Sequence, residues 1–188
     1  MGSIKELMRE APVHERNLQM RTYPLDDGRL IAEGWLRDER FTSGFHWSGK
    51  PRPHGVVHWI CVRLLLEGWP LRIVDAEAEM PDIPHEKCPT TLPSLENIIG
   101  ITIESGFSAE IIKRIGGVKG CTHMTHLIVA MGPAALHGYW TQKSREPGPP
   151  LKSIEEYEGL PYLINSCRLW REDGPIMKEF RELLGKQA

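Results

Sequence analysis

The sequence lacks any apolar run long enough to cross a membrane. The longest candidates, residues 60–66 and 127–136, fall well short of the ~20 residues that a spanning helix needs. The first residues, MGSIKELMREAPVHERN, are charged throughout and lack the apolar core of a secretory signal. We therefore expect a protein without a membrane anchor or export signal, located in the cytoplasm.

The chain also lacks a strong charge of either sign and any cysteine pair. It has 23 Lys and Arg against 25 Asp and Glu, a formal charge of -2, which gives no electrostatic basis for binding nucleic acid or an anionic membrane. No Rossmann fingerprint or P-loop is present, so no organic cofactor is expected. The cysteines form no C-x-x-C pair and are expected to be reduced thiols. They are Cys61, Cys88, Cys121 and Cys167.

What is present is the composition of an ordinary globular protein. Hydrophobic residues make up 40% and charged residues 26% of the 188 residues, a length that fits one domain. The first twenty residues are polar, and no internal repeat follows them. We expect a polar N-terminal arm over 1–20 and a single α+β domain over 21–188.

Strand patterns come first along the chain and helix patterns follow. The Asp27–Gly28 pair predicts the tight turn of a hairpin. After it, the residues at even positions over 30–36 alternate with those at odd positions as in a strand. A second antiparallel pair is predicted over 56–66 and 71–80, where turn residues bound two runs of strand length. Helices are predicted over 92–99, 108–116, 122–133 (resuming through 140) and 177–188. Together these elements predict an α+β fold, an antiparallel sheet of about four or more strands with helices packed on one face.

The most distinctive stretch is RIGGVKGCTHMTH, residues 114–126. One interpretation is purely structural: the glycines end one helix and allow a sharp reversal before the next helix begins. Cys121 is then a small buried residue, and His123 is a first-turn residue without a special task.

The same stretch also suits catalysis. A glycine-rich turn before a helix presents backbone N–H groups that favour a developing oxyanion, and the helix dipole there stabilises a thiolate at Cys121. His123, in the first turn, is suited to transferring protons, and Arg114 adds positive charge. We therefore expect Cys121, His123 and Arg114 to be catalytic. The substrate-binding turn is expected to include Gly117, Gly120 and Thr122.

A metal centre is the alternative for this region. His123 and His126 are three residues apart and so lie on one helical face. Either His58, or His85 together with Cys88 in the sequence HEKC, would complete a site for a divalent metal such as zinc or iron. No H-E-x-x-H motif is present.

Two strands and one loop supply further candidates. His58 lies on an apolar strand face, as a core histidine or as a catalytic partner of His123. The carboxylates of DAEAE share one face of the next strand, which is either solvated or provides a general base. We expect Asp75 to be catalytic and Glu77 to bind substrate. Trp47, in a loop rich in Gly and Pro, is expected to stack on the substrate.

Four segments, LRIVDAEAEMPDIPHEKCP, LENIIGITI, RIGGVKGCTHMTHL and YLINSCRLWREDGP, resemble a bacterial family of domains of unknown function. Its members share an R-x-G-G-x-x-G-C-T-H-[LM] core, a preceding D-A-x-A strand and a C-terminal L-I-[DN]-x-C segment. The likeness runs from about Arg21 to Pro175 and implies no known reaction. This chain has Asn165 where related chains usually carry Asp, and Arg168 where an aromatic residue or histidine is usual. Besides the glycine-rich core, the resemblance favours Asp75, Cys88, Asn165 and Cys167.

These features favour proton-transfer and nucleophilic chemistry on a small apolar or aromatic substrate. We expect a lyase, with carbon–carbon cleavage of the retro-aldol kind, in which His123 is the acid/base and Asp75 or His58 is its partner. The alternative is a metal- or ligand-binding accessory protein without turnover. An exposed sheet edge would allow a homodimer.

Overall fold

The computed structural model describes residues 2–151 and 153–185. The chain divides into two compact units, Met1–Gly138 and Tyr139–Ala188, where the sequence predicted one domain over 21–188. The first unit holds a β-sheet and the helices that cover it. The second holds the end of one long helix and the C-terminal helices.

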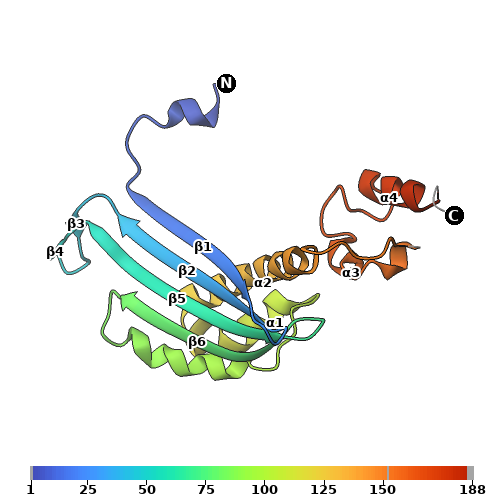
Figure 1. The fold of residues 1–188 in the computed structure, drawn as a ribbon. Helices are drawn as coiled ribbons and strands as arrows, with labels where there is room; N and C mark the ends of the chain where they lie inside the picture. Colours follow the sequence, from blue (N-terminus) through green and yellow to red (C-terminus); the bar gives the residue numbers. More distant parts are fainter. Residues whose placement is uncertain (1, 152, 186–188) are drawn as a thin grey trace. The chain divides into compact units, whose positions relative to one another are not determined.

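The first unit is built on a four-stranded antiparallel sheet with the strand order β1-β2-β5-β6 (Figure 1). Both predicted strand pairs are confirmed, and so is the α+β class. A short hairpin of β3 (Gly44–Phe45) and β4 (Pro51–Arg52) lies between β2 and β5 in the chain. The four strands of the main sheet are β1 (His14–Pro24), β2 (Leu30–Arg40), β5 (Gly55–Glu67) and β6 (Arg72–Asp82).

Alternation along β2 and β5 separates two faces of the sheet. The inner face carries buried apolar side chains such as Leu30, Leu36, Ile60 and Leu64, whereas the outer face carries most of the charged and aromatic residues. Alternation over 30–36 predicted this inner face correctly. The buried set of β2 extends two residues further, to Asp38.

Helices cover the inner face of the sheet (Figure 1). A Cβ at Gly34 would lie 2.6 Å from Met131 Sδ, so glycine lets α2 approach β2 closely. Helix α2 continues through Pro133 without the expected interruption. The segment expected as a helix over 92–99 is a 3-10 helix. The helical elements that begin in this unit are η1 (Ile4–Leu7), η2 (Cys88–Ile98), α1 (Phe107–Ile115), η3 (Gly117–Lys119) and α2 (Thr122–Lys143).

The N-terminal arm is shorter than the predicted 1–20, because β1 already begins at His14. Most residues of β1 are exposed, since this strand forms one edge of the sheet. An exposed edge strand carries polar side chains on both faces, and its sequence therefore resembles a polar tail.

The second unit contains η4 (Ile154–Glu156), α3 (Leu160–Leu163) and α4 (Pro175–Gly185). Aromatic rings hold it together: the ring of Phe180 lies 5.6 Å from that of Tyr157 and 6.4 Å from that of Trp170, between centroids. The final helix, expected over 177–188, begins at Pro175, and residues 186–188 lie outside the described part of the chain.

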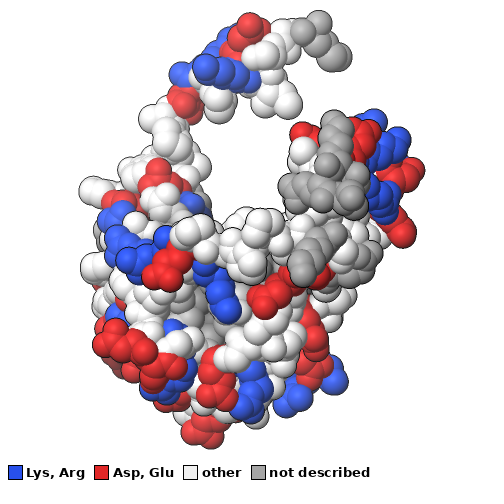
Figure 2. Space-filling view, turned by 45° about the vertical axis from the view of Figure 1, so that its right-hand side comes forward, with Lys and Arg blue, Asp and Glu red and all other residues white. Residues whose placement is uncertain are grey.

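Within the described residues, no helix combines the length and apolarity that a bilayer span requires. Figure 2 shows Lys and Arg side chains interspersed with Asp and Glu over the visible face of the molecule. This mixture agrees with the formal charge of -2.

Candidate functional site

Three neighbouring strands place one polar residue each in a row on the inner face. Arg16 of β1 lies opposite Asp38 of β2, and Asp38 lies opposite His58 of β5. Directly opposed residues of antiparallel strands have their side chains on the same face and within reach of one another. Backbone register alone therefore brings a guanidinium, a carboxylate and an imidazole together.

Asp38 is the centre of this row, with a side chain only 4% exposed. Arg16 binds it in a two-pronged manner, with Nε donating to Oδ1 at 2.6 Å and Nη2 donating to Oδ2 at 2.7 Å. The Nδ1 atom of His58 lies 3.0 Å from Oδ2. On the other side, Nε2 of His14 lies 3.6 Å from Oδ1. These contacts neutralise and hydrogen-bond a carboxylate that would otherwise be costly to bury.

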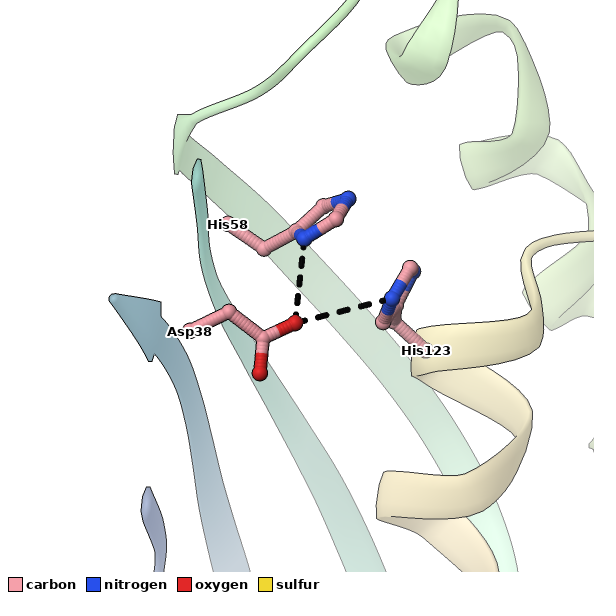
Figure 3. A group of neighbouring side chains, drawn as sticks. All are labelled: Asp38, His58 and His123. Carbon is pink, nitrogen blue, oxygen red and sulfur yellow. Dashed lines mark hydrogen bonds and ion pairs between the residues drawn. The ribbon is translucent and has the colours of Figure 1, made fainter. Parts of the chain in front are cut away.

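Helix α2 adds the second imidazole (Figure 3). His123, in its first turn, places Nε2 at 3.7 Å from Oδ2 of Asp38, and its ring lies 3.8 Å from the ring of His58 between centroids, at 33°. The Nδ1 atom of His123 lies 3.9 Å from Sγ of Cys121, the residue just before the helix. We call Arg16, Asp38, His58 and His123 the Asp38 cluster.

The glycines of the 114–126 segment set where α2 begins. Gly117 has a φ of +61°, a conformation that side chains with a Cβ rarely adopt. At Gly120 a Cβ would lie 2.7 Å from the carbonyl oxygen of Ile115 and 2.8 Å from Ser94 Oγ. These glycines are therefore needed by the chain path itself, and this path delivers Cys121 and His123 to the cluster.

A β-bulge adjoins the cluster. The register between β2 and β5 shifts between Asp38 and Glu39, immediately after the Asp38–His58 pair. Bulges bend a strand and redirect its side chains, and they are over-represented beside active sites.

The environment of the cluster fixes its charges. Burial opposes ionisation of Asp38, but the hydrogen bonds and positive charge of Arg16 hold the pKa of this carboxyl below its usual range. Burial lowers the pKa of His58, although Asp38 acts against it. Burial, together with His58 and Arg16, lowers the pKa of His123. At neutral pH the cluster therefore holds an ionised carboxylate and two neutral imidazoles.

The hydrogen bond to Asp38 also sets the tautomer of His58. An ionised carboxylate only accepts hydrogen bonds, so Nδ1 of His58 carries the hydrogen and Nε2 keeps a free lone pair. A histidine held in this way by a carboxylate is suited to accept a proton from a substrate.

The same side chains are also suited to hold a metal ion. One ligand atom from each of Asp38, His58 and His123 lies within 4.8 Å of the others, and two imidazoles with one carboxylate suit zinc or ferrous iron. Arg16 acts against this, because its guanidinium binds both oxygens of the carboxylate that a cation would need.

Of the residues proposed from sequence, the structure brings His58, Cys121 and His123 together. It adds Asp38 and Arg16, which sequence reasoning did not select. Asp38 lies two residues after Leu36 and so continues the buried face of β2. A carboxylate at such a position indicates a functional residue, because charged residues are rarely buried without a partner. Arg16 gives no such signal, because it lies in the segment predicted as a polar arm.

Asp75 and Glu77 do not take part in this cluster, which corrects the expectation that Asp75 partners a histidine. Asp75 pairs in register with Leu65, and its Oδ1 accepts a hydrogen bond from the N–H of Ala76. Glu77, 71% exposed, binds Arg63 on the outer face. Both carboxylates point away from the inner face, and Asp38 occupies the position expected for Asp75.

The remaining candidates are not members of the cluster. Arg114 pairs with Glu110 one turn earlier in α1. Trp47 is 92% exposed in the β3–β4 hairpin. The second histidine of α2 and the HEKC pair are not among the clustered metal-ligand atoms of the described residues. Thr122 is the exposed first residue of α2, His126 is exposed further along this helix, and His85 is exposed near the half-buried Cys88.

The fold and the cluster define an α+β domain with a carboxylate–histidine centre at the junction of sheet and helix. The model of the family described as "Protein of unknown function (DUF2889)" matches residues 14–137, and the chain belongs to this family. The match covers every residue of the Asp38 cluster and ends before Asn165 and Cys167, which lie in the second unit. No curated protein and no solved structure was found to match the chain.

Proposed function

We propose that this chain is a lyase whose acid–base chemistry is carried out by His58 and His123. The observation that supports this most directly is the buried Asp38. Neutralised by Arg16, it holds the hydrogen of His58 on Nδ1 and lies beside a second neutral imidazole. Neutral imidazoles are effective proton acceptors near neutral pH, and their conjugate acids are effective donors.

A retro-aldol cleavage uses this arrangement fully. Nε2 of His58 takes the proton from a substrate hydroxyl, the neighbouring carbon–carbon bond breaks, and an aldehyde leaves. The electron pair of that bond passes to the substrate's carbonyl group to form an enolate, which backbone N–H groups at the start of α2 stabilise. A proton from the imidazolium of the histidine pair then completes the second product. Protons and electrons balance without a redox partner.

The substrate is a small molecule with an apolar or aromatic part. The hairpin that joins β2 to β5, the two strands carrying Asp38 and His58, presents Phe45 and Trp47 to solvent. Exposed aromatic rings on a loop next to a site commonly contact ligands. We also place the protein in the cytoplasm, because all its cysteines are free thiols, as a reducing compartment would keep them.

A substrate screen tests the proposal. The purified chain is incubated with small aromatic β-hydroxy carbonyl compounds, and released aldehyde is measured. We expect turnover of at least one compound, and we expect His58→Ala and His123→Ala each to lower kcat about 10²–10⁴-fold. His54→Ala is the matched control, because this histidine is exposed in the loop before β5 and contacts Ser43 rather than the cluster.

Circular dichroism of each variant separates loss of catalysis from loss of fold. A folded variant without both His58 and His123 that keeps the wild-type rate would show that these imidazoles do not transfer the proton. Absence of aldehyde release from every compound would exclude the retro-aldol assignment.

A metal-binding protein without turnover is the second candidate, favoured by the spacing of the Asp38, His58 and His123 ligand atoms. Elemental analysis of protein purified without chelator, and again after incubation with zinc or ferrous iron, distinguishes it. Stoichiometric metal that is lost in His123→Ala and retained in His54→Ala would favour this candidate over metal-free acid–base catalysis.

A further inference from the structure

Strand β1 leaves one edge of the sheet open. Among the described residues it pairs with β2 alone, and it is the first strand in the sheet order. It runs for 11 residues, of which nine are exposed. Such an edge presents unpaired N–H and C=O groups to any strand of matching shape.

The hydrogen bonds at the ends of the β1–β2 ladder identify those groups. The N–H of Phe41 donates to the carbonyl of Val13, and the N–H of Leu25 donates to the carbonyl of Arg29. The register between these ends is regular, and hydrogen-bonded pairs recur at every second residue of an antiparallel ladder. Odd-numbered residues of β1 therefore bond to β2, while even-numbered residues from His14 to Thr22 direct their backbone groups to the open edge.

The sequence of β1 is complementary to itself when a second copy runs antiparallel with Leu18 on the two-fold axis. Glu15 then lies opposite the partner's Arg21, and Arg21 lies opposite the partner's Glu15. Asn17 lies opposite the partner's Gln19, so two amides meet. Cross-strand pairs of opposite charge stabilise a ladder, and the symmetry makes every favourable pair occur twice.

We propose that this chain forms a two-fold symmetric homodimer by pairing β1 with β1 of a second copy, centred on Leu18. The two sheets join into one continuous sheet. Leu18, which is 47% exposed in the single chain, is covered by its counterpart. The even-numbered N–H and C=O groups are satisfied without any rearrangement of the β1–β2 ladder.

The charge pairs favour this register over the pairing centred on Gln19. Side chains alternate between the two faces of a strand, so a one-residue shift of one β1 against the other would exchange the inner and outer faces. Only shifts of two residues keep the inner faces of the two sheets on the same side. Centring the pair on Gln19 would place Glu15 against a tyrosine and Arg21 against an asparagine, and both ion pairs would be lost. Within its own chain Arg21 makes a long contact of 3.9 Å to Glu33, so it is able to turn toward a partner.

Sedimentation velocity of the full chain over a range of concentrations tests the proposal. We expect a species of twice the 21.4 kDa chain mass. Glu15→Arg or Arg21→Glu places like charges opposite one another at two symmetric positions, and we expect either change to raise the dissociation constant roughly thirtyfold. The double variant, with the two charges exchanged, should restore the wild-type value.

Leu18→Lys provides a second disruption that leaves the backbone unchanged, because it brings two ammonium groups together at the axis. Arg37→Ala, on β2, is the control and should leave association unchanged. A wild-type chain that stays monomeric at all concentrations would overturn the proposal. The proposal would equally be overturned if the single charge reversals left the dissociation constant unchanged, or if the double variant failed to restore the wild-type value.

Discussion

The two faces of the sheet each carry an ion cluster, and the two clusters are built in opposite ways. On the inner face one carboxylate, that of Asp38, is surrounded by an arginine and histidines. On the outer face one guanidinium, that of Arg63, binds three carboxylates on β2 and β6. They are Glu33, Glu77 and Glu79.

The two clusters differ in how far their carboxylates are buried. Glu77 and Glu79 are largely in water, which screens their attraction to Arg63. Asp38 is buried, so loss of a partner there leaves a charge that water cannot easily solvate. The inner cluster therefore fixes the protonation states of its members more strongly than the outer cluster does. Strand register brings both sets of charges together, but burial makes only the inner set suited to acid–base catalysis.

The largest expected effect follows from Asp38→Asn. The amide keeps the size of the side chain, but it no longer forces the hydrogen of His58 onto Nδ1, and it cannot stabilise an imidazolium. We expect kcat to fall about 10²–10⁴-fold for any substrate found in the aldehyde-release screen.

Glu33→Gln is the matched change on the outer face, since Glu33 is a partly buried carboxylate bound by an arginine. It should leave kcat unchanged within about twofold, because Glu33 lies on the outer face of the sheet, away from the Asp38 cluster. Equal losses in the two amide variants would show that the inner cluster has no special role.

Arg16→Ala tests the same contrast through stability. Removing the guanidinium leaves the Asp38 carboxylate buried beside the neutral imidazoles of His58 and His123. We expect the free energy of unfolding, measured by urea denaturation, to fall by about 2–3 kcal/mol. Arg37→Ala is the control, because Arg37 is 39% exposed like Arg16 but pairs with the more accessible Glu39. Its loss should be below about 1 kcal/mol.

Much of this fold follows from local pattern. Alternation predicted the inner face of β2, and the Asp27–Gly28 turn located the hairpin, because these signals lie within a few residues of one another. The start of β1 did not follow, because most side chains of this edge strand are polar and exposed. The continuity of α2 through Pro133 also did not follow, because the packing of the helix on the sheet outweighs the local cost of the proline.

The candidate site was only partly predictable for a related reason. Cys121 and His123 lie in one distinctive segment, and His58 lies on an apolar strand face, so the sequence alone drew attention to them. Asp38 joins them through the register of β2 with β5, and Arg16 through the register of β1 with β2. Register depends on pairing between distant segments, and one sequence without structure left Asp75 as the more conspicuous carboxylate.

The pH dependence of stability should reveal the neutral histidines. The folded-state pKa values of His58 and His123 are lowered, chiefly by burial. Below about pH 6.5 the unfolded chain takes up protons that the folded chain does not. The free energy of unfolding should therefore fall as the pH drops below this value, by up to about 1.4 kcal/mol per pH unit for each histidine.

Urea denaturation on both sides of about pH 6.5 measures this slope. His123→Gln should reduce the slope, and His54→Ala should reproduce that of the wild type. Stability that rises as the pH falls from neutral would mean that the histidines of the inner cluster are protonated in the folded protein.

The smallest effect is expected on the outer face, with Arg63→Ala. Hydrogen bonds from Arg63 to Glu79 and Glu33 raise the pKa of this guanidinium, yet the partners of Arg63 on β6 are open to solvent. We expect a loss of about 1 kcal/mol or less in the free energy of unfolding, which shrinks further as salt is added. Urea denaturation at low and high ionic strength checks this. A loss as large as that of Arg16→Ala, unaffected by salt, would mean that the outer cluster is as isolated from water as the inner one, and the contrast between the two faces would no longer hold.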